Sequence, residues 1–254
     1  MIPDRWRRLG RTRGEGAGRR RRWWVWAGTG LVSALLAAVG VLVVSYPAMA
    51  ASACPGCYGF ERVEDRVYAG GGLSDDRRRA IGTIMTAADH RIGDFYGSRL
   101  SRPTVLICTT DECYQRIGGG REKGRAFLNR TLMLSPEGIN VVIATHELAH
   151  VEFHERLNSG GVPQWFDEGL AVLVSDDPRY LGPDGPADRC LVDQPGTLPA
   201  TLAEWMRADG GDQLYARAAC RVSRWAAAHG GAEAVRDLLR RLNAGESFTA
   251  VVPG

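Results

Sequence analysis

Two histidines and a glutamate stand together in HELAH, residues 146–150, inside the longer run NVVIATHELAHVEFHERL. Apolar residues recur at helical spacing along this run, which predicts a helix from Asn140 to about Leu157. Because an α-helix repeats every 3.6 residues, His146 and His150 lie one turn apart on one face, and their imidazoles can bind the same cation. Glu147 points in an adjacent direction, from which its carboxylate can act as a general base on a metal-bound water. The motif therefore predicts a Zn²⁺ site with hydrolytic chemistry.

A catalytic zinc ion needs a third protein ligand and one open position. His154 lies one turn beyond His150, but its distance from His146 is about 12 Å along the axis at 1.5 Å per residue, so one ion cannot bind both. We therefore expect His154 in an outer or solvated position. His90 and His229 belong to other predicted helices, have no motif beside them, and are expected at the surface.

A better third ligand is Glu168, which follows His150 by 18 residues in the segment PQWFDEGLAVLVSDD. This separation allows a helix end, a glycine turn and a second helix, Gln164 to Ser175, packed antiparallel beside the first. Gly169 lets the two helix backbones approach closely, and the Glu168 carboxylate would complete a His₂Glu site. Asp167 is the alternative ligand, although its side chain is one methylene shorter and points about 100° away around the helix.

HELAH followed by P-x-W-F-D-E-G-L-A resembles the gluzincin metallopeptidases, specifically the small membrane-linked or secreted peptidase-MA-like group. HExxH alone is a weak pattern, but with the second segment at this distance it becomes a strong one. The resemblance extends over residues 60–250, and residues 139–175 carry its specific part. It implies the HExxH…E core of these enzymes and a zinc-dependent peptidase activity.

The resemblance also implies a role for each matching residue. His146, His150 and Glu168 would bind zinc, and Glu147 would polarise the attacking water. Asp167 would orient a ligand or the helix.

Two further features follow from the resemblance. The strand AFLNRTLML, residues 126–134, would be the edge strand that receives the peptide substrate, held mainly through its backbone. Related enzymes stabilise the oxyanion with a tyrosine or histidine from the C-terminal helices. Tyr215, in QLYARAAC, is the candidate for this role, and the alternative interpretation is a tyrosine that only packs between helices. Tyr180, on a loop, is a weaker candidate.

The remaining pattern predicts an α+β domain with a small mixed sheet first and a mainly helical half after it. The elements that we expect are an amphipathic helix at 74–97, strands at 103–110 and 126–135, a turn-rich loop at 118–125, a long loop at 176–200 and helices from there to the C-terminal end.

The first residues indicate a membrane segment. Residues 1–22 carry nine arginines against two acidic residues, so this tail is basic, and residues 23–46 form an uncharged apolar run with tryptophans at its start. Such a run is long enough to cross a bilayer, with the arginines on the cytoplasmic side. We expect a signal anchor, then a juxtamembrane segment at 47–73 and an extracytoplasmic peptidase domain at 74–254. The alternative is secretion after cleavage near Ala50, where Ala-Met-Ala forms an A-x-A site.

All six cysteines follow the predicted span, which suggests three disulfides formed outside the cytoplasm. Six cysteines permit fifteen pairings, and the sequence does not choose among them. The simplest pairing is local, 54–57, 108–113 and 190–220. CPGC at 54–57 does not open a helix after a strand, so we interpret it as structural and not as a redox motif.

The leading interpretation is a membrane-anchored zinc metallopeptidase that hydrolyses peptide bonds with a water activated by Glu147. A catalytically inactive zinc-binding or sensing ectodomain is the alternative, and a purely structural ectodomain is the third. Nucleic acid is a poor partner for the basic tail, because an apolar run follows it directly. The sequence indicates neither the natural substrate nor an oligomeric state.

Overall fold

The computed structural model describes residues 37, 40–41, 43–158, 161–185, 188–192 and 196–252. The chain divides into two compact units, Met1–Tyr46 and Pro47–Gly254. The predicted basic tail and most of the predicted span at 23–46 lie outside the described residues. Among the residues that are described, no helix has the length and apolar character needed to cross a membrane.

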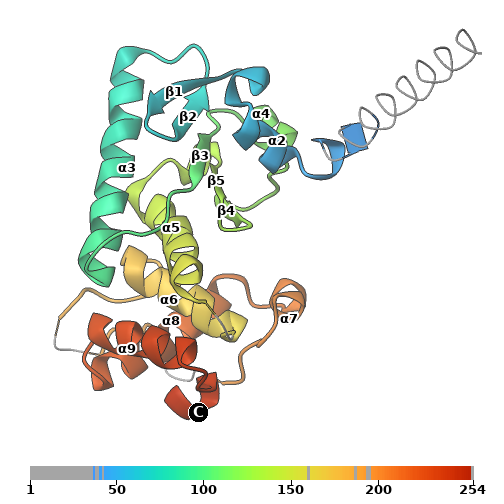
Figure 1. The fold of residues 1–254 in the computed structure, drawn as a ribbon. Coiled ribbons are helices and arrows are strands. Elements are labelled where there is room, and N and C mark those ends of the chain that lie inside the picture. Colours follow the sequence, from blue (N-terminus) through green and yellow to red (C-terminus); the bar gives the residue numbers. More distant parts are fainter. Residues whose placement is uncertain are drawn as a thin grey trace, which may run out of the picture. The chain divides into compact units, whose positions relative to one another are not determined.

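A five-stranded mixed sheet forms one part of the second unit, as the predicted α+β class requires (Figure 1). Its strands are β1 (Phe60–Glu64), β2 (Val67–Gly70), β3 (Thr104–Ile107), β4 (Gly124–Phe127) and β5 (Thr131–Leu134), in the order β1-β2-β3-β5-β4. The central pairs β2–β3 and β3–β5 are parallel, and the outer pairs β1–β2 and β4–β5 are antiparallel. The strand β4 is therefore an edge strand.

The central strands β3 and β5 are apolar after their first threonine, because helices cover both faces of the sheet. Side chains alternate between the faces, so Val105 and Leu132 join the large core under α3 (Asp75–Tyr96) and α5 (Val141–Arg156). Leu106 and Met133 join a smaller cluster with α2 (Pro47–Ala53) and α4 (Asp111–Arg116) on the other side (Figure 1).

The single strand predicted at 126–135 is wrong, because this run is a β-hairpin. Leu128 and Asn129 have φ values of 48° and 54°, and the Arg130 N–H donates to the Phe127 carbonyl at 3.1 Å. Two central residues with positive φ form the turn that matches the twist of paired strands. The edge strand is therefore Gly124–Phe127, which begins inside the predicted loop 118–125, and β5 is an interior strand.

Residues 47–73 contribute to the folded unit. After α2 come the 3-10 turn η1 (Pro55–Tyr58) and the two strands β1 and β2. Ala48 and Ala51 are buried in the smaller core cluster. The Ala-Met-Ala residues at 48–50 thus lie within α2, where Ala48 is buried and Met49 is exposed.

The helices predicted at 74–97, 140–157 and 164–175 are present as α3, α5 and α6 (Gln164–Ser175). Side chains cap the first two, because Ser74 accepts a hydrogen bond from the N–H of Arg77 and Asn140 from that of Ile143. The other helical elements are η2 (Pro136–Gly138), α7 (Leu202–Arg207), α8 (Gly211–Ala228), α9 (Ala232–Asn243) and α10 (Phe248–Val251).

The three predicted disulfides are present as Cys54–Cys57, Cys108–Cys113 and Cys190–Cys220. The last one joins the long loop after α6 to the middle of α8. This cross-link holds the loop close to the helix that carries Tyr215.

Candidate metal centre

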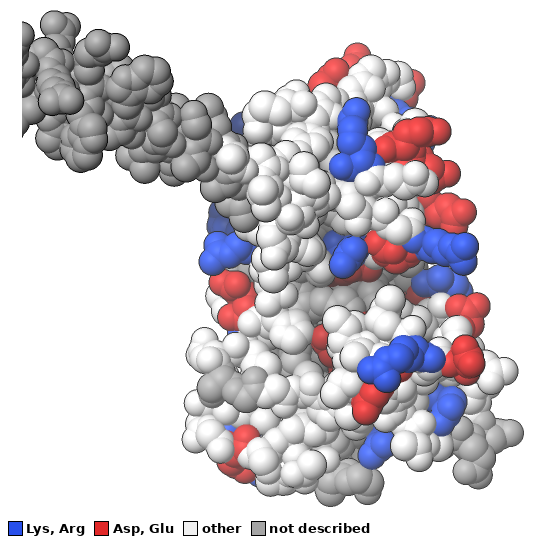
Figure 2. All heavy atoms as spheres, turned by 90° about the vertical axis from the view of Figure 1, so that its right-hand side faces the viewer, with Lys and Arg blue, Asp and Glu red and all other residues white. Residues whose placement is uncertain are grey.

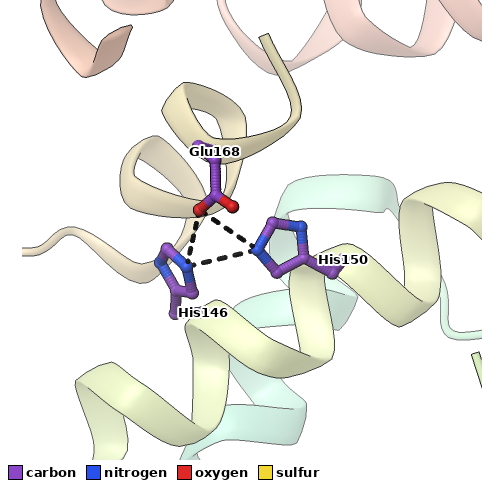
Figure 3. Close-up of side chains that lie close together, drawn as sticks. All are labelled: His146, His150 and Glu168. Atoms are coloured by element: carbon purple, nitrogen blue, oxygen red, sulfur yellow. Dashed lines mark hydrogen bonds and ion pairs between the residues drawn. The ribbon is translucent and has the colours of Figure 1, made fainter. Parts of the chain in front are cut away.

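Helix α5 presents the two histidines of HELAH on one face (Figure 3). Their ring centroids lie 4.9 Å apart, and the Nε2 atoms of His146 and His150 are separated by 3.2 Å. Two imidazole nitrogens this close together point at one small volume. The predicted convergence of the two rings is therefore present.

Helix α6 supplies the carboxylate from across the gap (Figure 3). The Oε2 atom of Glu168 lies 3.5 Å from Nε2 of His146 and 3.6 Å from Nε2 of His150. The three ligand atoms lie within 4.8 Å of one another, a group that could hold a metal ion. The cluster is compatible with the HExxH…E arrangement of the zincins.

Close packing of α6 on α8 fixes where Glu168 stands. A Cβ atom on Gly169 would lie 2.4 Å from the Ala218 carbonyl oxygen and 2.8 Å from a methyl carbon of Val222. Only glycine allows this approach. The sequence correctly indicated that Gly169 permits close helix packing, but it assigned the contact to the first motif helix, whereas the glycine faces α8.

The first turn of α6 has no side-chain cap, since Pro163 occupies the N-cap position. Carbonyl groups from the segment before α7 replace the cap. The N–H of Gln164 donates to the Ala200 carbonyl at 2.8 Å, and that of Trp165 donates to the Pro199 carbonyl at 3.2 Å. The start of α6 is thereby fixed in rotation as well as in position.

The charge of the Glu168 carboxylate is stabilised by the two histidines. Burial by itself raises the pKa of Glu168, but hydrogen bonds and charge interactions with His146 and His150 outweigh it and lower the pKa below its ordinary value. Both Glu168 and His146 expose less than a tenth of their surface. The carboxylate is therefore ionised at neutral pH and available as a ligand.

Asp167 is not a member of the ligand group but contacts one of its histidines. Its Oδ1 atom lies 3.0 Å from Nδ1 of His150, and its Oδ2 atom lies 2.9 Å from Nε2 of His154. Because an ionised carboxylate only accepts hydrogen bonds, Nδ1 of His150 carries the proton, and Nε2 is the nitrogen directed at the ligand group. Burial lowers the pKa of His150, but Asp167 and Glu168 outweigh it and raise the pKa well above its ordinary value.

His154 is therefore neither a ligand nor a freely solvated side chain. It lies in the outer position that its spacing along the helix allowed, and Asp167 links it to His150. His90 and His229 are exposed and stand outside the ligand group, as expected.

Glu147 lies beneath the edge strand of the sheet. A Cβ atom on Gly124 would stand 2.6 Å from Cγ of Glu147, so the glutamate occupies the space that a side chain on β4 would need. Burial raises the pKa of Glu147, while the two histidines and a hydrogen bond from the Ala126 backbone lower it, and the net shift is upward.

Tyr215, on α8, lies near the cluster without belonging to it. Its ring centroid is 6.3 Å from that of His146, and it stacks on Tyr180 at 5.3 Å and meets Trp205 edge-on at 5.2 Å. The hydroxyl of Tyr180, the alternative candidate, donates a hydrogen bond to Asp212 at 2.7 Å. Burial raises the pKa of Tyr215, so its hydroxyl keeps its proton at neutral pH.

The sequence does not reveal two residues that contact this site. Gln164 donates from its side-chain amide to Oε1 of Glu168 at 3.0 Å. Gly124 makes the contact with Glu147 described above. The spacing of four residues between Gln164 and Glu168 was a usable signal for the first, whereas the second depends on a hairpin that the sequence did not reveal.

The strand β4 and the helix α7 lie on the same side of the protein (Figure 1). Figure 2 views the protein from this side, where the surface is hollowed at mid-height. Comparisons with protein families, curated proteins and solved structures find no match for this chain. The interpretation of this site therefore depends on its residues and their geometry alone.

Proposed function

We propose that this protein is a zinc-dependent peptidase, with His146, His150 and Glu168 as the metal ligands and Glu147 as the general base. The observation that carries the proposal is the convergence of Glu168 Oε2 on the two Nε2 atoms, at 3.5 and 3.6 Å. Two imidazoles and one carboxylate are the ligand set of catalytic zinc sites that keep an open position.

The donor set fits a divalent cation in its chemistry as well as in its spacing. The buried carboxylate is ionised, and the hydrogen bond from Nδ1 of His150 to Asp167 leaves Nε2 of that ring to face the other ligands. A zinc ion bound there would supply a Lewis acid that polarises a carbonyl group and lowers the pKa of water.

Glu147 would carry the proton in the reaction. We propose that its carboxylate takes a proton from the attacking water and passes it to the amine that leaves. The raised pKa of this buried group makes it a stronger base than an exposed glutamate. Tyr215 would donate a hydrogen bond to the oxyanion, because its hydroxyl remains protonated in its buried position.

The substrate would bind as an extended peptide beside β4. This strand is the edge of the sheet next to α5, and its Gly124 contacts Glu147 directly. An edge strand offers backbone groups to a further strand, which gives binding with loose sequence preference.

The membrane-anchored location proposed for the protein depends on the apolar run at 23–46 and the basic tail before it.

The test compares the full-length chain, purified in detergent, with its Glu147→Gln variant on a mixed peptide or casein substrate. We expect Glu147→Gln to lose cleavage by at least about 100-fold while it keeps its zinc, because general-base catalysis contributes this much. Glu155→Gln, an exposed change on the same helix, is the matched control and should leave cleavage unchanged.

Other outcomes identify the alternatives. If the wild type and Glu147→Gln bind zinc and neither cleaves any substrate, the inactive binding or sensing module is favoured. If the wild type binds no zinc, the structural ectodomain is favoured.

A further inference from the structure

We propose that Gln164 is a positioning residue that holds the Glu168 carboxylate so that one chosen oxygen faces the two histidines. This inference rests on the metal centre proposed above and assigns a role to a residue outside its ligand set.

The two oxygens of Glu168 have different partners. Oε1 accepts a hydrogen bond from Nε2 of Gln164 at 3.0 Å, whereas Oε2 faces His146 and His150. Because an ionised carboxylate can only accept, the glutamine must present its NH₂ group to Oε1. The amide therefore fixes the rotation of the carboxylate about its last bond and keeps Oε2 directed at the imidazoles.

The backbone of Gln164 is itself held in place. It is the first residue of α6, where helical N–H groups have no partner within the helix, and its N–H donates to the Ala200 carbonyl at 2.8 Å. The side chain then spans one helical turn to Glu168. A chain of contacts thus runs from the segment before α7, through Gln164, to Oε1 of the Glu168 carboxylate.

The hydrogen bond between Gln164 and Glu168 is suited to this role because it is shielded from solvent. Glu168 exposes only 8% of its surface, and Gln164 is half-buried beside it. Water can replace a lost donor less readily at a buried carboxylate than at an exposed one. Removing the amide therefore frees the carboxylate to rotate, and groups that orient ligands in this way commonly change metal affinity by about 10–100-fold.

The experiment measures zinc affinity by competition with a chelator, and the visible spectrum of the cobalt-substituted protein, on the full-length chain. Gln164→Met keeps the length of the side chain and removes the donor. We expect its zinc affinity to fall about 10–100-fold and its cobalt spectrum to change. Gln164→Glu, which replaces the donor by a second carboxylate beside Oε1, should also lose the spectrum of the wild type.

The controls separate this role from packing and from the metal centre itself. Gln115→Met, at an exposed position of α4, should leave the affinity and the spectrum unchanged. Glu168→Gln should weaken binding more than Gln164→Met does. If Gln164→Met keeps the affinity and spectrum of the wild type while Glu168→Gln loses them, the positioning role is wrong and the metal centre stands. If the wild type binds no zinc, both proposals fail.

Discussion

Gly124 and Glu147 are in contact at the place where the edge strand crosses the motif helix. A methyl group on Gly124 would stand 2.6 Å from Cγ of the glutamate, so Gly124→Ala must displace that side chain. We expect peptide cleavage to fall by about 100-fold, since small displacements of a catalytic group have effects of this size. Zinc content should not change, and measurements of kcat and bound metal check both statements.

Gly70→Ala is the matched control for that substitution. Gly70 lies on β2, where a Cβ atom would meet only Thr109 Oγ1 at an ordinary 3.4 Å. Its activity should equal that of the wild type. Full activity in Gly124→Ala would show that the position of Glu147 beneath β4 does not matter for the reaction.

Asp167 contacts His150 directly and His154 through its other oxygen. Asp167→Asn keeps the shape and removes the charge that holds the proton on Nδ1 of His150. We expect zinc affinity to weaken by about 10–100-fold in this variant. His154→Ala should weaken it less, because His154 acts only through Asp167, and titration with zinc in the presence of a chelator measures both. Equal affinity in Asp167→Asn and wild type would contradict the role given to the carboxylate.

At the scale of elements, the packing of α6 on α8 depends on Gly169. Gly169→Ala would place a carbon 2.4 Å from the Ala218 carbonyl oxygen, so the two helices must separate. We expect the free energy of unfolding to decrease by about 1–3 kcal/mol, as overpacked cores show. Gly93→Ala, in α3 with open space around it, should instead increase it by up to about 1 kcal/mol through helix propensity. Urea unfolding distinguishes the two, and a neutral Gly169→Ala would contradict the packing argument.

The helices that carry the site were easier to predict from the sequence than the contacts between its residues. The spacing of His146 and His150 predicts their shared face from the helical repeat, and the 18 residues between His150 and Glu168 leave room for a second helix. The hairpin at 124–134 was missed because an apolar run does not show where a chain reverses, although Asn129 tolerates the left-handed conformation found there. Gln164 was missed because its contact depends on side-chain orientation in the first turn of α6.

At the scale of the whole molecule, the segment after the predicted span is built into the folded unit. Ala51 is fully buried between α2 and the sheet, whereas Ala53 on the same helix is exposed. Ala51→Leu should lower the free energy of unfolding by about 1–3 kcal/mol, and Ala53→Leu should have little effect. Thermal unfolding of the two full-length variants measures the difference. Equal stabilities would show that α2 is not part of the core.

The α+β class could be predicted because it depends on local patterns. The disulfide pairing could not be derived in this way, because six cysteines allow fifteen pairings, and the local set found here was only the simplest of them. The order of the strands could not be predicted either, since parallel neighbours such as β2 and β3 are joined through α3, and no local pattern encodes which strands pair.

The most direct test of the account is the zinc content of the full-length protein and of its Glu168→Gln variant after reconstitution and dialysis, together with X-ray absorption at the zinc edge. The account predicts one tightly held zinc ion in the wild type, with two imidazoles among its ligands, and loss of that ion in Glu168→Gln. Zinc that is absent from the wild type, or that stays bound equally when Glu168 is replaced, would contradict it.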